Sequence, residues 1–586
     1  MDSKDGSHRP LYFNIPEDFY NPIMDLWYSL LEYRDGIFFP LKPERLSETP
    51  VKKFHLDVLL FDIVRKFDPL KNVVLSPAVL FYNKLVCCIL NGMKVPEHLT
   101  PLERIAFHGL LAGLNESISR MCGSTLLFNV FFEHCQIALD RIKNLMHLFP
   151  DFSQVNLTSR WLANFIQDMH VGSDPRIFNQ ENQWIGRPIP IHTSLGSSGM
   201  GLITEALLLI KSAWGNEKLT ILLTQEIYYE LQSVAQDIFF DDLLLSTYLA
   251  CEQLTHVIIT EYQTNVNRKK SGHHSNDVCQ LISSQFNLRQ LYESDIPLIV
   301  VLDSTMNSIA DDNMATLLLN HREKITSGQL IIIDIYSLNK SFQLGLDMSP
   351  AGCCTCYFNP HRLSEHPQFQ RIVTHYNSTR ILASDMKQED ITVRWIAHMM
   401  TYAKDAPLAF HNLLRQSALA IGNIIPDTLK KLSAPCRGPF IKLDPMVSKE
   451  GDESWAFISL RPYNMKKELQ DAIETEIAIE LRKLFMYRDG YAFGLTTYAL
   501  IKAPHSPFIF RISIGAEPEE ALIPKMLSLF DYLQQLNARM KSDENKTSPV
   551  TRSLLIRREG IFFTGIKRHL EEPHDERGAK RVALPR

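Results

Sequence analysis

The sequence lacks a long hydrophobic run. No stretch of apolar residues reaches the roughly 18 that a membrane-spanning helix needs, and the first residues, MDSKDGSHRP, are polar, unlike a secretory signal. Cysteine is also scarce, since 10 cysteines in 586 residues are too sparse for a disulfide scaffold. Several lie in apolar runs such as LVCCIL, as buried thiols do in a reducing compartment. We therefore expect a cytoplasmic protein with no part in a membrane.

Motifs of common metal, nucleotide and hydrolase sites are missing too. The sequence contains no Walker sequence, no G-x-S-x-G and no H-E-x-x-H. Cys353 and Cys356 form a C-x-x-C pair within CCTC, but no second pair or nearby histidines complete a zinc site. The sequence therefore predicts a buried strand at CCTC and no metal site.

The charge balance excludes a strongly basic nucleic-acid binder. Lys and Arg number 61 and Asp and Glu 66, which gives a net charge of −5. Residues 541–586 form a polar, partly basic tail, which we interpret as solvated because no base-reading or aromatic-stacking pattern accompanies the charge. The length suits about three to five domains.

Hydrophobic patterns divide the rest of the chain into three parts. Residues 1–185 are mostly helical in pattern, and LTPLERIAFHGLLAGL begins with Thr100 as an N-cap and Glu103 as its capping-box partner. Residues 186–430 alternate helical segments with buried strands, KLTILLTQ, THVIITE, PLIVVLD and QLIIIDIY, which predicts an α/β domain with a mostly parallel sheet. Residues 431–540 have the pattern of a smaller α+β domain.

Three places in the α/β part carry candidate chemistry. Ser198, Gly199 and Met200 stand where a helix begins after a Gly/Ser turn, and backbone N–H groups at such an end attract a phosphate. Asp303 ends a buried strand, where a carboxylate faces the ligand crevice of a parallel sheet. Lys340 follows the next buried strand, and apolar surroundings favour the neutral amine that a Schiff-base nucleophile needs.

The order of phosphate cradle, strand-end acid and strand-end lysine resembles that of pyridoxal-phosphate enzymes of fold type I, and in particular the cysteine and methionine metabolism family. This family contains cystathionine synthases and lyases and methionine γ-lyase. The resemblance spans roughly residues 190–540 and rests on GSSGMG, TQEIYYEL, VIITEYQTN, VVLDSTM, IYSLNK and FRISIGAEPEEAL. It implies a mostly parallel α/β major domain, a small α+β C-terminal domain and pyridoxal 5′-phosphate as cofactor.

The resemblance also implies roles for single residues. Lys340 would be the catalytic lysine that carries the cofactor, and Asp303 would hold the pyridinium nitrogen protonated. Arg511 would bind the substrate carboxylate through its guanidinium. The tyrosine stacked on the ring would be Tyr228 or Tyr229. The implied cofactor-binding residues are Ser198, Gly199, Met200, Tyr228, Asn265, Asp303, Ser337 and Asn339.

Several positions depart from the family pattern. Asn339 replaces the threonine before the lysine, Ser304 the asparagine after the acid, and Gln263 a proline. The family's Y-x-R-x-x-N-P-T stretch, which reaches a neighbouring active site, has no clear match before residue 190, where the helical part stands. The resemblance nevertheless implies a homodimer or homotetramer.

The leading hypothesis is an enzyme that eliminates or replaces a group at the β or γ carbon of an amino acid. A carbon–sulfur lyase or a γ-replacement transferase of sulfur amino-acid metabolism and trans-sulfuration fits that description. Another fold type I reaction, by an aminotransferase or a decarboxylase, is an alternative, because Asp303 and Lys340 serve it equally well. A degenerate, non-catalytic scaffold is the third hypothesis.

Overall fold

The computed structural model describes residues 56–545 with gaps. The gaps are residues 69–73, 156–187, 197, 216, 225–228, 241–242, 247–252, 262–274, 306–312, 341, 347, 349, 385–390, 431–439, 446–456, 488–493 and 502–507. Most of the tail expected at 541–586 lies outside the described residues.

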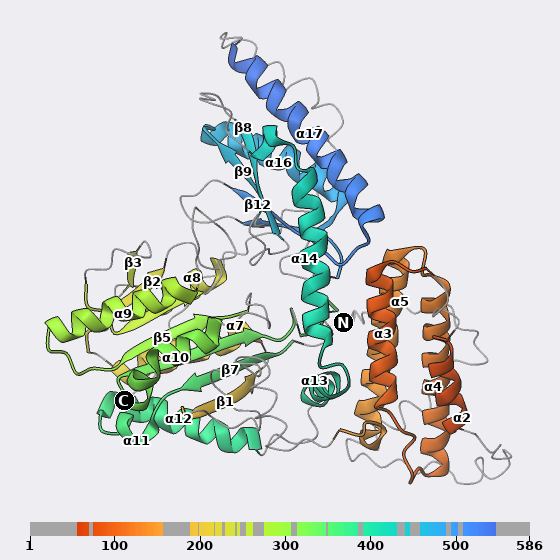
Figure 1. The fold of residues 1–586 in the computed structure, drawn as a ribbon, viewed down its shortest axis with the longest axis horizontal. Coiled ribbons are helices and arrows are strands. Elements are labelled where there is room, and N and C mark those ends of the chain that lie inside the picture. The colour runs from red at the N-terminus through yellow and green to blue at the C-terminus, as the bar shows by residue number, and fades with distance from the viewer. Residues whose placement is uncertain are drawn as a thin grey trace, which may run out of the picture.

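A helical layer opens the described chain (Figure 1). Its members are α2 (Leu56–Arg65), α3 (Pro77–Asn91), α4 (Pro101–Gly123), α5 (Phe128–Leu148) and the 3-10 helix η3 (Pro150–Phe152). The capping box expected at the start of α4 is confirmed. Glu103 N donates to Thr100 Oγ1 at 3.3 Å, and Thr100 N donates to Glu103 Oε2 at 2.8 Å.

The main sheet is mostly parallel, as predicted. Its strand order is β1-β7-β6-β5-β4-β2-β3, and β2 to β6 run parallel to their neighbours in this series. Strand β7 is antiparallel to both β6 and β1. The strands are β1 (Ile191–Gly196), β2 (Ile221–Thr224), β3 (Leu243–Ser246), β4 (Val257–Glu261), β5 (Leu298–Asp303), β6 (Leu330–Ser337) and β7 (Gly352–Tyr357). CCTC lies in β7, which confirms the buried strand expected there.

Helices cover both faces of the main sheet. The alternating side chains of its central strands divide into two cores, one shared with α7 and α8 and the other with α9 and α10. Because both faces are covered, the strands are continuously apolar rather than alternating. The helices are α7 (Gly199–Trp214), α8 (Tyr229–Phe239), α9 (Ser275–Leu291), α10 (Asn313–Thr326), α11 (Pro360–Leu363) and α12 (Pro367–Ser384).

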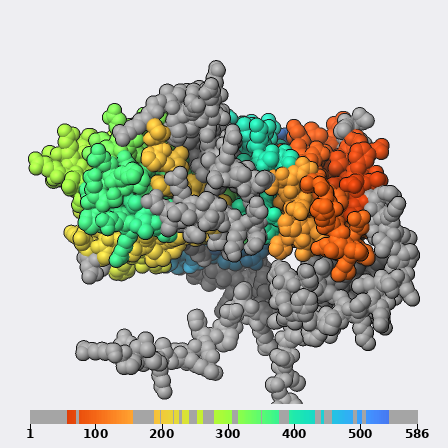
Figure 2. Space-filling view, turned by 90° about the horizontal axis from the view of Figure 1, so that it is seen from below, coloured from red at the N-terminus to blue at the C-terminus, as the bar shows by residue number. Residues whose placement is uncertain are grey.

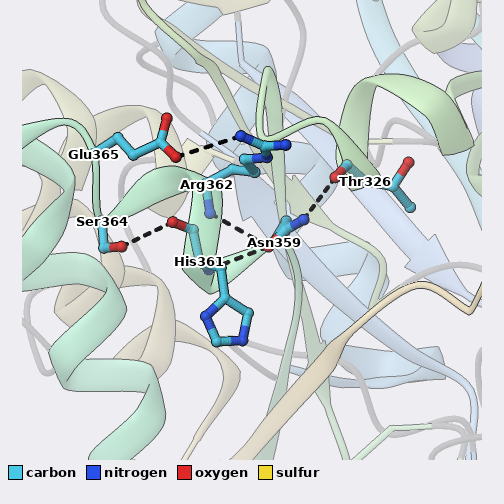
Figure 3. Close-up of polar contacts among 6 residues, drawn as sticks. All are labelled: Thr326, Asn359, His361, Arg362, Ser364 and Glu365. Atoms are coloured by element: carbon cyan, nitrogen blue, oxygen red, sulfur yellow. Dashed lines mark hydrogen bonds and ion pairs between the residues drawn. The ribbon is translucent and has the colours of Figure 1, made fainter.

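Asn359, which follows the end of β7, is hydrogen-bonded to the chain just before the start of β6 (Figure 3). Its Nδ2 donates to the carbonyl oxygen of Thr326 at 2.6 Å, just before β6 begins. Its Oδ1 accepts from the backbone N–H groups of His361 at 3.1 Å and Arg362 at 3.4 Å, which caps α11 just after β7. This anchor lies at the opposite ends of the strands from Ser337 and Gly352.

A smaller sheet follows, with strand order β10-β11-β12-β9-β8. Its pairs are antiparallel except for β10 with β11. The strands are β8 (Phe440–Pro445), β9 (Phe457–Tyr463), β10 (Met486–Tyr487), β11 (Thr497–Ile501) and β12 (Ile509–Ser513). They pack with α16 (Lys467–Leu484) and α17 (Glu519–Asn545).

Helices α13 (Ile391–Tyr402) and α14 (Ala406–Ile424) join the parts, with the short α15 (Asp427–Lys430) after them. Figure 2 shows teal side chains of this region between the sheet domain and the helical layer. The described residues contain no helix long and apolar enough to cross a bilayer. Nor do these residues hold a cluster of three or more His, Cys, Asp or Glu side chains suited to a metal ion.

His398 fastens α13 to the helical layer. Its Nε2 contacts the carbonyl oxygen of Ile89 at 2.9 Å, and its Nδ1 contacts Ser153 Oγ at 2.8 Å. The ring is 0% exposed. Burial lowers the pKa of His398 to about 4, although the hydrogen bond to Ile89 acts in the opposite direction.

We predict that this histidine makes stability fall in acid. Below its unfolded pKa of about 6.5, the unfolded chain takes up a proton that the folded chain does not. The contribution is therefore complete above pH 6.5 and is lost as the pH falls toward about 4, a change of about 3 kcal/mol. Urea unfolding across this range would show a flatter pH dependence in His398→Gln than in the parent. His361→Gln, an exposed control, would keep the parental slope, and equal slopes in all three proteins would refute the assignment.

Candidate functional site

Polar side chains converge at the carboxyl ends of β4, β5 and β6. The strand register places Glu261 beside Asp303, and Asp303 beside Ile335, two residues before Ser337. Glu261 is 1% exposed and Asp303 7%. The acid expected at the strand end is therefore joined by a second acid that the sequence argument left without a role, although it stands in VIITE.

The start of α7 is pressed against the ends of β6 and β7. Ser198 is the N-cap, and its Oγ accepts from Gly201 N at 2.9 Å. A Cβ added to Gly199 would lie 3.1 Å from Ser337 Cα, and one added to Gly352 would lie 2.5 Å from the carbonyl carbon of Ser198. Gly352 has no room for a side chain, and a Cβ at Gly199 would be a tight contact. They place the first N–H groups of α7 next to Ser337, an arrangement suited to an anion.

Thr305 links the strand-end acid to Ser337, the last residue of β6. Asp303 Oδ1 accepts from Thr305 N at 2.9 Å, and Thr305 Oγ1 accepts from Ser337 N at 3.0 Å. Burial raises the pKa of Asp303, while the hydrogen bonds from Thr305 and the charge of Lys340 lower it. The threonine belongs to VVLDSTM, but the sequence argument gave it no function.

Asp334 is a fully buried acid inside β6 that the sequence argument missed. Ser304 Oγ donates a short hydrogen bond to Asp334 Oδ1, and Ser304 N donates to Ile335 O at 2.9 Å. The charge of Asp334 is one of the influences that raise the pKa of Asp303. The only signal in the sequence was a polar residue within LIIIDIY.

Lys340 lies in the turn after β6 among charges of both signs. Burial lowers its pKa to about 8, an effect opposed by Asp303 and reinforced by the positive charge of Arg511. Glu230, in α8, and Glu261 favour the protonated form more weakly. An amine with such a pKa is neutral far more often near physiological pH than an ordinary lysine, and the neutral form is the nucleophile.

Arg511 reaches this group of charges from the small sheet. It is 1% exposed in the middle of β12, and its Cζ lies 5.1 Å from the ring centroid of Phe457. The turn that follows β12 is fixed by Glu517, which accepts from Thr496 N at 2.8 Å and pairs with Lys525 Nζ at 2.8 Å. The small sheet therefore delivers a guanidinium to the charges around Lys340.

Asn339 interacts with the chain itself. Its Oδ1 accepts from Ala351 N at 2.9 Å and from Gln343 Nε2 at 3.1 Å. These bonds close the loop that carries Lys340 between β6 and β7. The role in cofactor binding expected for Asn339 stays a prediction.

The structure brings together six of the residues singled out in the sequence. Ser198 and Gly199 meet Ser337 at the start of α7, while the environment of Lys340 includes Asp303 and Arg511. Met200 lies in the first turn of α7 with its side chain against the core. Tyr228 and Asn265 lie outside the described residues, and the side chain of Tyr229 does too.

No protein-family model and no curated protein sequence matches the chain. Solved structures do match at low identity. Cystathionine gamma synthase from Xanthomonas oryzae pv. oryzae is 13% identical, with 58% of this chain and 82% of that chain covered and a TM-score of 0.38. Cystathionine gamma-lyase from yeast is also 13% identical, with 58% of this chain and 81% of that chain covered and a TM-score of 0.38.

An aromatic-amino-acid aminotransferase from Burkholderia pseudomallei, covalently bound to pyridoxal phosphate, is 12% identical. The match covers 67% of this chain and 88% of that one, with a TM-score of 0.36.

We predict that Asp303 sustains the pKa of Lys340. In Asp303→Asn the loss of the nearby negative charge lowers that pKa below about 8. The pH dependence of Lys340 acetylation by acetic anhydride, followed by peptide mass spectrometry, measures the change. Asp531→Asn, which alters an exposed acid in α17, is the control and should titrate like the parent. An unchanged midpoint in Asp303→Asn would show that the two charges do not interact.

Proposed function

We propose that the chain is a pyridoxal-phosphate-dependent enzyme that acts on an amino acid. The observation that carries the proposal is the environment of Lys340: burial lowers its pKa to about 8 beside Asp303 and Arg511. A half-buried lysine, a buried acid and a buried arginine from three separate elements match the three charges that an amino-acid Schiff-base site requires.

The residues present fit the cofactor. The close approach of Gly199 to Ser337 forms a cradle that a Cβ would fill, and N–H groups and a serine hydroxyl suit the phosphate. Burial raises the pKa of Asp303, so a cationic ring nitrogen would supply the positive partner that favours its charged form. Lys340 would hold the cofactor covalently.

The side chains of the chain then have distinct tasks. Bound pyridoxal phosphate supplies an electron sink for a carbanion of the amino acid. Arg511 binds the substrate carboxylate and orients the amino acid, since a guanidinium pairs with a carboxylate through two parallel hydrogen bonds. Lys340 Nζ moves protons at the α and β carbons, a task that suits an amine with a pKa near the working pH. Asp303 keeps its negative charge while Arg511 binds the substrate and while Lys340 moves the protons.

We further propose elimination or replacement at the β or γ carbon as the reaction, with a carbon–sulfur bond as its target. This narrower proposal rests on the motifs of the sequence resemblance, from GSSGMG to FRISIG. The homodimer or homotetramer expected from the same resemblance stays a prediction, as does the cytoplasmic location.

The first test is covalent capture of pyridoxal phosphate. The purified protein with added cofactor should show a visible Schiff-base band. After borohydride reduction, mass spectrometry should find the cofactor on Lys340. Lys340→Ala should lose both signals, whereas Lys324→Ala, which alters a surface lysine bonded to Gln329, should keep them. No band in the parent, even with excess cofactor, would overturn the proposal and leave the scaffold hypothesis.

The second test concerns Arg511. In Arg511→Lys the visible band should persist, while binding of L-cystathionine and L-methionine, followed by the spectral change, should weaken roughly 10-fold to 150-fold because a charge-assisted pair is lost. The matched amines that lack the carboxylate should bind parent and variant alike. If the amines also bind more weakly, or if the amino acids bind both proteins equally, Arg511 has a different role.

A further inference from the structure

The segment that follows Lys340 has an unusual backbone. This post-lysine segment, residues 342–348, leads from the lysine turn toward β7, and all of it except residue 347 is described. Leu344 has φ of 58° and Gly345 φ of 73°. A leucine in the left-handed region is strained and persists only where its surroundings hold it.

Three side chains of the helical layer hold this segment. Tyr82 Oη donates to Leu344 O at 2.9 Å, Gln136 Nε2 to Leu346 O at 3.2 Å, and Lys143 Nζ to Met348 O at 2.8 Å. The acceptors are alternate carbonyl groups along the segment. Gln136 and Lys143 are seven residues apart in α5 and therefore share one helix face. The donors form a row matched to the segment.

Apolar contacts reinforce the row. Tyr82 is 0% exposed, and its ring centroid lies 5.1 Å from that of Phe132 in α5. A Cβ added to Gly494, which precedes β11, would lie 2.1 Å from Phe132 and 2.9 Å from Gly345 O. The helical layer, the post-lysine segment and the small-sheet part of the chain therefore meet at one junction.

The position of the segment is passed on to Lys340. Gly345 N donates to Lys340 O at 3.4 Å, and Gln343 Nε2 donates to Asn339 Oδ1 at 3.1 Å. Burial raises the pKa of Tyr82 well above its usual range, so the phenol remains a neutral donor at working pH. Because of these two bonds, a movement of Leu344 would also move the turn that carries Lys340.

We propose that the helical layer is a positioning element for Lys340, and that Tyr82, Gln136 and Lys143 are the positioning residues that act through the post-lysine segment. The effect of this positioning on catalysis rests on the proposed function. The positioning of Lys340 by the helical layer does not. The layer holds Leu344 in its left-handed conformation and keeps Lys340 in the position where burial lowers the pKa of its amine.

The test compares Tyr82→Phe with Tyr532→Phe in the full chain. Tyr532 lies in α17, and its hydroxyl donates to Glu476 Oε1 of α16 at 3.1 Å. It is a matched control away from the post-lysine segment. Loss of the Tyr82 bond should speed hydrogen–deuterium exchange of peptides covering 342–351 roughly fivefold, and it should raise the midpoint of Lys340 acetylation above pH 8 as water enters. The control should change neither measurement.

Lys143→Met provides a second, milder variant, because it removes a donor from a partly buried site while it keeps an apolar stem. We expect it to shift the exchange rate and the acetylation midpoint in the same direction as Tyr82→Phe. It therefore keeps the test decisive even if Tyr82→Phe does not fold. Parental exchange and a parental acetylation midpoint in the folded variants would overturn the inference. Neither measurement needs the cofactor. A parent protein that takes up no pyridoxal phosphate would therefore refute the proposed function and leave this test intact.

Discussion

The close approach of α7 to the ends of β6 and β7 is the constraint on which the site depends. Gly352 leaves no room for a side chain at this contact, since an added Cβ would lie 2.5 Å from the backbone of Ser198, and one at Gly199 would lie a tight 3.1 Å from Ser337. A larger residue at either position would lift the helix start away from the sheet. The start of α7 would then separate from Ser337, whose backbone N–H is linked through Thr305 to Asp303. Two glycines therefore keep the cradle and the strand-end acid in one place.

Charge balance is the second requirement. Each buried charge in the site costs free energy unless an opposite charge lies near it. Asp303 and Glu261, at the carboxyl ends of β5 and β4, carry charge opposite to that of Lys340 and Arg511. The two acids raise the pKa of Lys340, and Arg511 lowers it. The outcome is an amine that loses its proton much more readily than an ordinary lysine does. A lysine with its pKa lowered toward neutral pH is suited to the proton transfers of the proposed function.

The sequence alone predicts the part of this arrangement that depends on local pattern. Continuous apolar runs such as PLIVVLD and QLIIIDIY predict buried parallel strands, and Asp303 and Lys340 follow from their places at the strand ends. Thr305 and Asp334 could not be predicted in their roles, because their partners depend on strand register. Tyr82 was beyond reach for a stronger reason: its partner Leu344 lies 262 residues away in the chain. Nothing local in PAVLFYNKLV marks that tyrosine among the other aromatic residues of the helix.

Such long separations also order the assembly of the site. Contacts between residues far apart in sequence must overcome the entropy of closing a long loop, so they form after local helices and neighbouring strands. Strand β6 and the lysine turn can form from neighbouring sequence. The left-handed Leu344 gains its support only when α3 and α5 pack against the segment. The same holds for Arg511, since its own strand belongs to the small sheet. Lys340 therefore has its full surroundings only when all three parts of the chain have met, because the first third supports the segment that follows the lysine.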